Sequence, residues 1–300
     1  MALRPRIPKS TNACLRKTYT CYTFTLKNNN LRRVTLPPSP KSILITGASS
    51  GIGAALARHY AQAGVTLFLG GRDAQRLEAV AADCRARGAE AHAHPSDVAD
   101  AEAMRAWVEG SDATAPLNLV VANAGIALGA TSVDGLHEAA MDSFAINVGG
   151  ILNVVHPAVA CMAKRGQPVT DGQIAIMSSI MGYVGVARSP AYSYSKGTAR
   201  LYGQSLRGAL RHMGVRVSVI CPGYVDTPLN QYNTSPMPFM VTSEKAAEII
   251  AKGLARNKGR ITFPWQIRLI GRVLHCLPNA LVDRINTPWG RPPLEGSPPE

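Results

Sequence analysis

Two side chains with complementary acid–base chemistry, Tyr192 and Lys196, stand four residues apart in a segment with a helical pattern. Four residues make about one helical turn, so the phenol and the ammonium group would project from the same face. A nearby positive charge favours the phenolate and lowers the pKa of a tyrosine from its usual value of about 10. Such a phenol can give and take a proton as a general acid and base.

The pair alone is weak evidence, because a tyrosine followed four residues later by a lysine occurs by chance in many helices. Tyr194 is a competing phenol, but Thr198 rather than a lysine follows it at that spacing. Ser178 and Ser179 end a strand-like run before the helix, and strand alternation sends their side chains to opposite faces. Only one of these hydroxyls should therefore reach the site, where it can hydrogen-bond an oxygen on which charge develops.

A glycine-rich turn, Thr46 to Gly53, connects a short apolar run to a helical pattern. Glycine suits a backbone that turns tightly or lies against a pyrophosphate. The start of a helix also offers free N–H groups and a positive dipole end to an anion. The turn predicts a dinucleotide site, although three glycines alone are weak evidence. The expected contacts are Gly47, Ser49, Ser50, Gly51, Ile52 and Gly53.

The end of the second expected strand indicates which dinucleotide would bind. A site for NAD usually carries an acidic residue there, about 20 residues beyond the glycines, to hold the ribose 2′-hydroxyl. Here the strand ends in Leu69-Gly70-Gly71-Arg72, and Asp73 follows where it would cap a helix. The guanidinium of Arg72 can pair with a 2′-phosphate, although it could also be a solvated loop residue. We therefore expect NADP ahead of NAD.

Strand-like and helix-like segments alternate from residue 41 to about residue 222. This rhythm predicts an α/β fold, a doubly wound parallel sheet of Rossmann-like type, in one domain over residues 41–300. Ligands bind such sheets at the carboxyl ends of the strands. The expected strands are 43–45, 65–69, 90–95, 117–121, 173–177 and 215–221. The expected helices are 52–63, 73–87, one starting at Asp100, 137–164, 192–213 and 243–256.

The composition is that of a globular protein, with 46% apolar and 17% charged residues. No run of about 18 uncharged apolar residues predicts a membrane span. The six cysteines form neither a CxxC pair nor a cluster with histidines at metal-ligand spacing, so we expect buried free thiols and no metal.

The net charge of +13 is concentrated at one end of the chain, since residues 1–40 carry eight basic residues and no acidic one, which leaves +5 for residues 41–300. This weakens the case for nucleic-acid binding, and none is expected. We expect residues 1–40 to be a flexible basic extension. It is either a disordered tail or the product of a start codon placed too far upstream, in preference to an organelle transit peptide.

The order of these motifs resembles the short-chain dehydrogenase/reductase family over about residues 41–265. Residues 46–53 match its TGxxxGxG turn and 123–125 its NAG motif, while Ala122 stands where a second asparagine is frequent. The tyrosine and lysine match YxxxK, which with TGxxxGxG indicates the shorter branch of the family. Further matches are Asn147 for its active-site asparagine, Ser179 for its serine thirteen residues before the tyrosine, and Pro222-Gly223 with Thr227 for PGxxxT.

The resemblance implies a role for each matched position. Tyr192 would be the general acid and base, Ser179 would bind the substrate oxygen, and Asn147 would anchor a water that relays protons from Lys196. Lys196 would also hold the nicotinamide ribose. Cofactor contacts are further implied for Asp97 with the adenine, Asn123 near the adenosine ribose, Thr227 with the carboxamide, and also for Pro222 and Val225.

Together these features predict an NADPH-dependent oxidoreductase that interconverts a carbonyl compound and an alcohol. By analogy with the family we expect a homo-oligomer, and a cytoplasmic location ahead of a peripheral membrane or organellar one. A non-catalytic dinucleotide-binding protein, with or without membrane association, is the main alternative. Lyase or isomerase chemistry on the same scaffold is another.

Two segments bear on the substrate and on the surroundings of the protein. Residues 228–242 are either an apolar substrate lid, which would indicate a lipophilic substrate, or a loop packed on the core. Residues 261–285 form a basic amphipathic pattern. We expect it to pack on the protein or on another subunit, with contact to an anionic membrane as the alternative.

Overall fold

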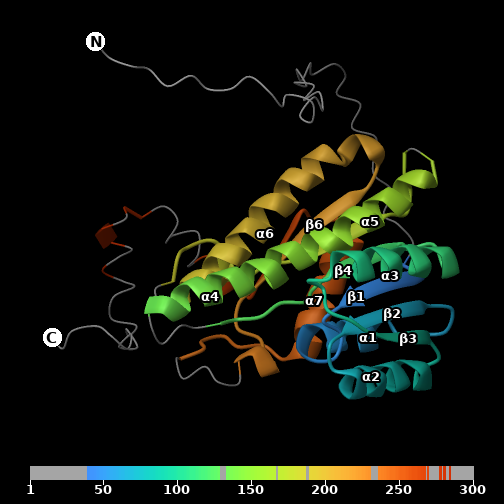
Figure 1. Ribbon diagram of the computed structural model, residues 1–300, viewed down its shortest axis with the longest axis horizontal. Helices are drawn as coiled ribbons and strands as arrows, with labels where there is room; N and C mark the ends of the chain where they lie inside the picture. The colour runs from blue at the N-terminus through green and yellow to red at the C-terminus, as the bar shows by residue number, and fades with distance from the viewer. Residues whose placement is uncertain are drawn as a thin grey trace, which may run out of the picture. The chain divides into compact units, whose positions relative to one another are not determined.

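The computed structural model describes residues 39–128, 133–166, 168–186, 189–230 and 236–267, together with residues 269, 277, 278, 280, 281 and 284. Their centre is a parallel sheet of seven strands in the order β3-β2-β1-β4-β5-β6-β7 (Figure 1). The strands are β1 Ser42–Thr46, β2 Thr66–Gly71, β3 Glu90–Pro95, β4 Leu119–Ala122, β5 Gln173–Met177, β6 Arg216–Pro222 and β7 Arg260–Phe263. The predicted doubly wound, Rossmann-like α/β fold is confirmed.

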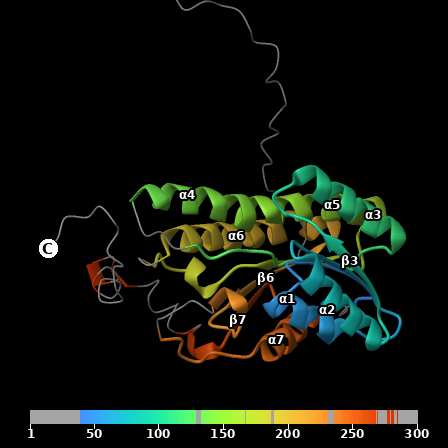
Figure 2. The ribbon, with the colours of Figure 1, turned by 60° about the horizontal axis from the view of Figure 1, so that its bottom comes forward.

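Helices cover both faces of this sheet (Figures 1 and 2). One apolar cluster joins the sheet to α1 Gly51–Tyr60, α2 Ala74–Ala86 and α7 Ser243–Ala255. A second cluster joins the other face to α3 Ala101–Thr114, α5 Gly150–Lys164 and α6 Pro190–Ala209, beside which lies α4 Val133–Phe144. The central strands are buried on both faces, which explains why they are continuous apolar runs without alternation.

The chain reverses its direction across the sheet between β1 and β4. β1 pairs with β2 on one side and with β4 on the other, so the loops that follow β1 and β4 diverge to opposite faces. Such a switch point leaves a crevice at the carboxyl ends of the strands. The glycine-rich turn follows β1, and Asn123 follows β4.

Local capping accounts for several helix starts. The Asp73 side chain accepts a hydrogen bond from the Arg76 N–H at 2.9 Å, and that of Asp100 accepts from the N–H groups of Glu102 and Ala103. Both carboxylates satisfy N–H groups that would otherwise lack a partner. The predicted caps at Asp73 and Asp100 are confirmed.

The long helix expected over residues 137–164 is interrupted. A π-helical turn, η1 Ala145–Gly149, separates α4 from α5. A π turn admits one more residue per turn than an α-helix and often lies at a functional site. Asn147 lies in it, so the prediction of one regular helix is wrong where the site residue is placed.

The segment expected to be an amphipathic helix over residues 261–285 begins as a strand. Arg260–Phe263 form β7, which pairs with β6, and a cis peptide bond joins Phe263 to Pro264. Thr262 and its neighbours have strand rather than helix geometry because the β6 edge offers them hydrogen-bonding partners. Most of the segment after Ile267, and residues 1–38 of the basic extension, lie outside the described residues.

Among the described residues, one helical segment, Gly135–Lys164, is long and apolar enough to cross a membrane by length and composition alone, although no membrane span was predicted. In the fold, its second half contributes Ile151, Val154 and Val155 to the core on one face of the sheet. Packing against the sheet accounts for this apolarity.

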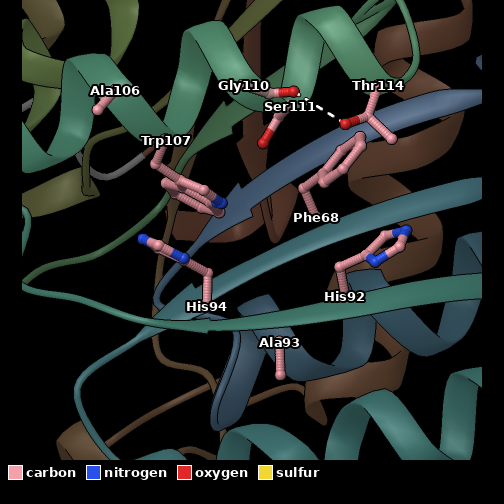
Figure 3. Close-up of a pocket in the computed structure, with 9 residues that line it drawn as sticks. All are labelled: Phe68, His92, Ala93, His94, Ala106, Trp107, Gly110, Ser111 and Thr114. Atoms are coloured by element: carbon pink, nitrogen blue, oxygen red, sulfur yellow. Dashed lines mark hydrogen bonds between the residues drawn. The ribbon is translucent and has the colours of Figure 1, made fainter.

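Aromatic side chains stack in pairs between α3 and the face of strands β2 and β3 (Figure 3). Trp107 of α3 stacks on His94 with ring centroids 5.0 Å apart, and Phe68 stacks on His92 at 5.2 Å. A groove of about 240 Å³ lies between these pairs. Gly70 makes this packing possible, because a Cβ atom there would lie 2.5 Å from the Trp107 ring.

We predict that Gly70→Ala lowers the free energy of unfolding by about 1 to 3 kcal/mol, because the added methyl group overlaps the Trp107 ring, which is stacked on His94. Gly110→Ala is a matched control, since Gly110 lies in α3 with no atom within 4 Å of an added Cβ. It should leave stability unchanged or raise it by up to about 1 kcal/mol. Urea unfolding followed by circular dichroism measures both, and a fully stable Gly70→Ala protein would contradict this account of the packing between α3 and the sheet.

Candidate active site

The glycine-rich turn brings the β1 end and the start of α1 into close contact. Gly47 and Gly51 have φ values of +64° and +52°, which residues with a side chain rarely adopt. A Cβ atom on Gly53 would lie 2.1 Å from the Gly47 carbonyl oxygen. All three positions therefore need glycine.

The first turn of α1 is open to an anion. Its N-cap residue, Ser50, makes no side-chain capping bond, and the turn holds no acidic residue. By contrast, side chains of Asp73, Asp100 and Thr242 cap α2, α3 and α7. The N–H groups of α1 and its positive dipole end are thus available to a phosphate.

Asn123 fastens this turn to the end of β4. Its side-chain nitrogen donates to the carbonyl oxygens of Thr46 and Gly47, at 3.0 and 3.1 Å. In return, the Thr46 hydroxyl accepts from the backbone N–H groups of Asn123 and Ala124. The side-chain amide of Asn123 therefore holds the backbone of the glycine turn in place.

The segment after β6 lies against the same turn. A Cβ atom on Gly51 would lie 2.9 Å from the Thr227 methyl group, so Thr227 borders the start of α1. Pro222 ends β6, and Val225 is buried and bridges to Val241. This bridge fixes Thr227 between the glycine turn and the segment expected to be a lid.

Arg72 and Asp73 lie side by side at the end of β2 but have different surroundings. Asp73 is engaged by the backbone N–H and the side chain of Arg76, which together hold the pKa of its carboxyl below its usual value. Arg72 is exposed and directly follows Gly71, where an added Cβ would lie 3.2 Å from the Ser49 hydroxyl. Arg72 therefore follows a residue that contacts the glycine turn, while the Asp73 carboxylate serves as a cap.

Asp97 follows β3 at the same edge of the sheet. One of its carboxylate oxygens accepts a hydrogen bond from the Ala99 N–H at 2.9 Å, which forms a local turn. The side chain is exposed there and has acceptor capacity left for an amino group.

Tyr192 and Ser179 meet where β5 ends above α6. Their hydroxyl groups are hydrogen-bonded. The competing Tyr194 is 58% exposed and stacks on Phe144 on the outer surface of the helices. The competing Ser178 points elsewhere, with its hydroxyl 2.7 Å from the Lys196 carbonyl oxygen.

Lys196 is buried, with its ammonium group 5.7 Å from the centre of the Tyr192 ring. The ammonium donates to the Met177 carbonyl oxygen at 3.3 Å. Burial lowers the pKa of Lys196 to about 8, because a charged amine loses its water shell there. The ammonium retains donor capacity for further oxygen acceptors.

The expected lowering of the Tyr192 pKa is not found in the chain by itself. Burial of the phenol raises the pKa of Tyr192, and the hydrogen bond from Ser179 opposes this only in part. Desolvation by burial is the larger of the two effects and disfavours the phenolate.

Asn147 is fully buried in the π-helical turn. Its side chain exchanges two hydrogen bonds with the backbone of Ile126, at 2.8 and 2.9 Å, and donates to the Ser195 hydroxyl at 2.9 Å. Asn147 thus links the loop after β4 to the helix turn that carries Tyr192 and Lys196.

Two glycines, Gly125 and Gly182, complete the site, and no role in it was predicted for either. A Cβ atom on Gly125 would lie 2.8 Å from the Asn147 side-chain oxygen and 2.9 Å from the Lys196 nitrogen. One on Gly182 would lie 2.7 Å from the Lys196 backbone. Glycine in loops next to Asn123 and Ser179 was the available signal.

The segment over residues 228–242 carries exposed apolar side chains where it is described. Phe239 and Met240 are 49% and 48% exposed, and Phe239 has a φ of +59°, which is uncommon outside glycine. These two residues do not pack on the core, whereas Val241 of the same segment packs against it. Residues 231–235 of the segment lie outside the described residues. Among the residues that the structure describes, no group of three His, Cys, Asp or Glu side chains could hold a metal ion.

Several known proteins are similar to this chain in sequence or in fold. The family model described as short chain dehydrogenase matches residues 41–238. An uncharacterized oxidoreductase of Myxococcus xanthus is 36% identical over 247 residues, which cover 82% of this chain and 96% of the relative. The 1-deoxy-11-beta-hydroxypentalenate dehydrogenase of Streptomyces exfoliatus is 33% identical over 225 residues, covering 73% and 81%.

Among solved structures, a short-chain dehydrogenase from Sphingobium yanoikuyae in complex with NADPH superimposes with a TM-score of 0.67. The match covers 82% of this chain and 92% of the other at 22% sequence identity. This similarity supports the fold.

We predict that Lys196→Met raises the free energy of unfolding by about 1 to 3 kcal/mol at pH 7, because it removes a buried ammonium whose pKa is lowered from 10.5 to about 8. Between these two pKa values the unfolded lysine holds a proton that the folded one has lost, so the wild-type protein gains stability as the pH rises. The advantage of the variant should therefore be complete below about pH 8 and shrink towards pH 10.

The control is Lys252→Met on α7, where the lysine side chain is 73% exposed. Its stability should follow the wild-type protein at every pH. Urea unfolding of the three proteins from pH 7 to pH 10 measures the difference. A constant gap between Lys196→Met and wild type over this range would contradict the buried charge.

Proposed function

This chain belongs to the short-chain dehydrogenase/reductase family and is an oxidoreductase of that family, and we propose that it uses NADPH to reduce a lipophilic carbonyl compound to an alcohol. The observation that carries the proposal is the cluster of Ser179, Tyr192 and Lys196 beside the uncapped start of α1. An acid–base group and an open phosphate site lie at the same edge of the sheet.

The glycine turn fits the pyrophosphate of such a cofactor. The backbone N–H groups at Ser50, Gly51 and Ile52 face no acidic side chain, and the three glycines remove the Cβ atoms that would fill the turn. Asn123 would keep the turn in shape, Asp97 would accept from the adenine amino group, and Thr227 with Val225 would border the carboxamide.

The spare donor capacity of Lys196 fits the hydroxyl groups of a ribose. Its ammonium lies beside Gly125 and donates to the Met177 carbonyl oxygen, and its burial limits the access of bulk solvent. Asn147 would connect the same ammonium to a water, as the resemblance implies. When bound, NADPH supplies the hydride.

Tyr192 supplies the proton in this proposal. Burial raises its pKa, so at neutral pH the phenol keeps the proton that a reduced carbonyl oxygen must receive. Ser179 would hold the same oxygen through its hydroxyl while negative charge develops there. In the opposite direction Tyr192 must lose its proton, and the positive charges of Lys196 and an oxidised nicotinamide would favour that loss.

Preference for NADPH over NADH rests on the end of β2. Asp73 is occupied as a helix cap, which leaves Arg72 as the charged side chain free to bind beside Ser49. Arginine suits a phosphate because its planar fork can make two parallel hydrogen bonds.

The substrate class and the partners are proposed from surface features. Exposed Phe239 and Met240 favour an apolar substrate under the lid. A homo-oligomer is supported by exposed apolar side chains on the neighbouring helices α4 and α6 (Figure 2), namely Met141, Phe144, Tyr194 and Leu201. We propose a cytoplasmic enzyme, with peripheral membrane contact through the C-terminal segment as the alternative.

We predict that Tyr192→Phe lowers carbonyl-dependent oxidation of NADPH by about 10²- to 10⁴-fold while NADPH still binds. The assay is loss of NADPH absorbance over a panel of apolar ketones and aldehydes, with binding followed by cofactor fluorescence. Tyr194→Phe is the matched control on the same helix and should keep wild-type turnover. Normal turnover by Tyr192→Phe would remove this phenol from the mechanism.

A second prediction concerns the 2′-phosphate. Arg72→Asp should weaken NADPH binding by at least about 10-fold more than NADH binding, because the new carboxylate repels the phosphate and can accept from a 2′-hydroxyl. Arg87→Asp, at the opposite end of α2, should change neither. Titration of both cofactors by fluorescence distinguishes the outcomes, and equal weakening of the two by Arg72→Asp would show that Arg72 does not read the phosphate.

A further inference from the structure

Two adjacent serines at the end of β5 contact two neighbouring turns of α6. The Ser179 hydroxyl bonds the Tyr192 phenol, and the Ser178 hydroxyl donates to the Lys196 carbonyl oxygen at 2.7 Å. Ser178 is 2% exposed, so water does not compete for this bond. The two side chains diverge because neighbouring residues in extended backbone point to opposite sides.

Lys196 is held from three directions by one short stretch of chain. The Met177 carbonyl accepts from its ammonium at 3.3 Å, and Ser178 bonds its backbone carbonyl. Gly182 lies so close that a Cβ atom would approach the Lys196 carbonyl carbon to 2.7 Å. Both ends of the lysine are thus positioned relative to the strand that also carries Ser179.

Ser178 is itself supported by a hydrogen-bonded chain across the sheet. Its hydroxyl also bonds the Cys221 thiol of β6, which bonds the Tyr183 hydroxyl, which in turn bonds Thr262 of β7. Because a carbonyl oxygen only accepts, the Ser178 proton points to Lys196.

Arg200 ties the same loop back to α6. Its guanidinium lies 4.6 Å from the centre of the Tyr183 ring and donates to the Gly182 carbonyl oxygen at 3.1 Å. Arg200 is one helical turn beyond Lys196. The loop after β5 is therefore attached to α6 on both sides of the lysine backbone.

We propose that Ser178 is a positioning residue, whose hydrogen bond to the Lys196 carbonyl fixes α6 relative to β5 and so sets the distance between the Lys196 ammonium and the Tyr192 phenol. The inference rests on the proposed function, because that distance matters only if the phenol exchanges a proton during turnover. An ion's effect on a neighbouring group varies inversely with distance, so a displacement of about 1 Å changes the phenol's pKa by a few tenths of a unit or more.

The experiment compares Ser178→Ala with Ser218→Ala in the full-length chain. Ser218 is a matched control, because it is fully buried in β6 and hydrogen-bonded to the Gln173 side chain at 3.2 Å, away from Lys196. The first readout is ionisation of Tyr192, taken as the tyrosinate absorbance that disappears in a Tyr192→Phe background, with NADP⁺ present. The second is the pH profile of kcat for alcohol oxidation.

For Ser178→Ala we expect the tyrosinate midpoint and the acidic limb of the kcat profile to move up by about 0.5 pH unit, with kcat falling about 10-fold and KM for NADP⁺ changing less than 3-fold. Ser218→Ala should lose stability to a similar extent but keep the wild-type midpoint and kcat. Ser178→Cys, which retains a weak donor of similar size, should shift in the same direction by less and serves if the alanine variant does not fold.

Equal tyrosinate midpoints in Ser178→Ala, Ser178→Cys and wild type would overturn the positioning role, whatever happens to stability. Failure of the proposed function looks different, since turnover would then be absent in wild type or unaffected by Tyr192→Phe. The absorbance titration needs no substrate, so it decides the role of Ser178 in either case.

Discussion

A positive charge is buried next to the phenol of this site, and the surrounding structure keeps it there. Moving an ammonium group out of water costs several kcal/mol, and the drop in the Lys196 pKa to about 8 corresponds to about 3 kcal/mol. One carbonyl oxygen, that of Met177, accepts from the ammonium within the described residues. Such an arrangement persists only where the rest of the fold supplies the stability, as the two fully buried apolar layers do here.

The location of that charge follows from the parallel sheet. Every strand ends at the same edge, so loops that are distant in sequence converge beside α6: the glycine turn after β1, Asn123 after β4, Ser178 and Ser179 after β5, and Thr227 after β6. These loops can approach one another closely because several of the residues at the contacts are glycines. Gly53, Gly125 and Gly182 each stand where a Cβ atom would be less than 3 Å from a neighbour. The glycines make the site compact, while Asn123 and Asn147 connect its loops by hydrogen bonds.

Sequence reasoning succeeds where the cause is local. The caps at Asp73 and Asp100 and the strand–turn–helix at residues 43–60 depend on neighbours in the chain, and they were predicted with small errors at the boundaries. It fails where residues distant in the sequence determine the local structure. The π turn at Asn147 exists beside hydrogen bonds to Ile126 and Ser195, and β7 exists because the β6 edge is open to pairing. The direction of the Tyr192 pKa shift was also missed, since burial cannot be read from a four-residue spacing.

The same contrast explains why a role could be predicted from the sequence for Ser179 but not for the adjacent Ser178. Ser179 is visible in sequence through its thirteen-residue spacing from Tyr192, which the family shares. Ser178 has no such signal, because its partner is a backbone carbonyl and every residue type provides one. When a side chain bonds only the backbone of a functional residue, the residue type of its partner gives no sign of the contact. Residues of this kind are found by asking where each buried hydroxyl proton goes, and at Ser178 the answer is the backbone of the lysine on which the acid–base chemistry depends.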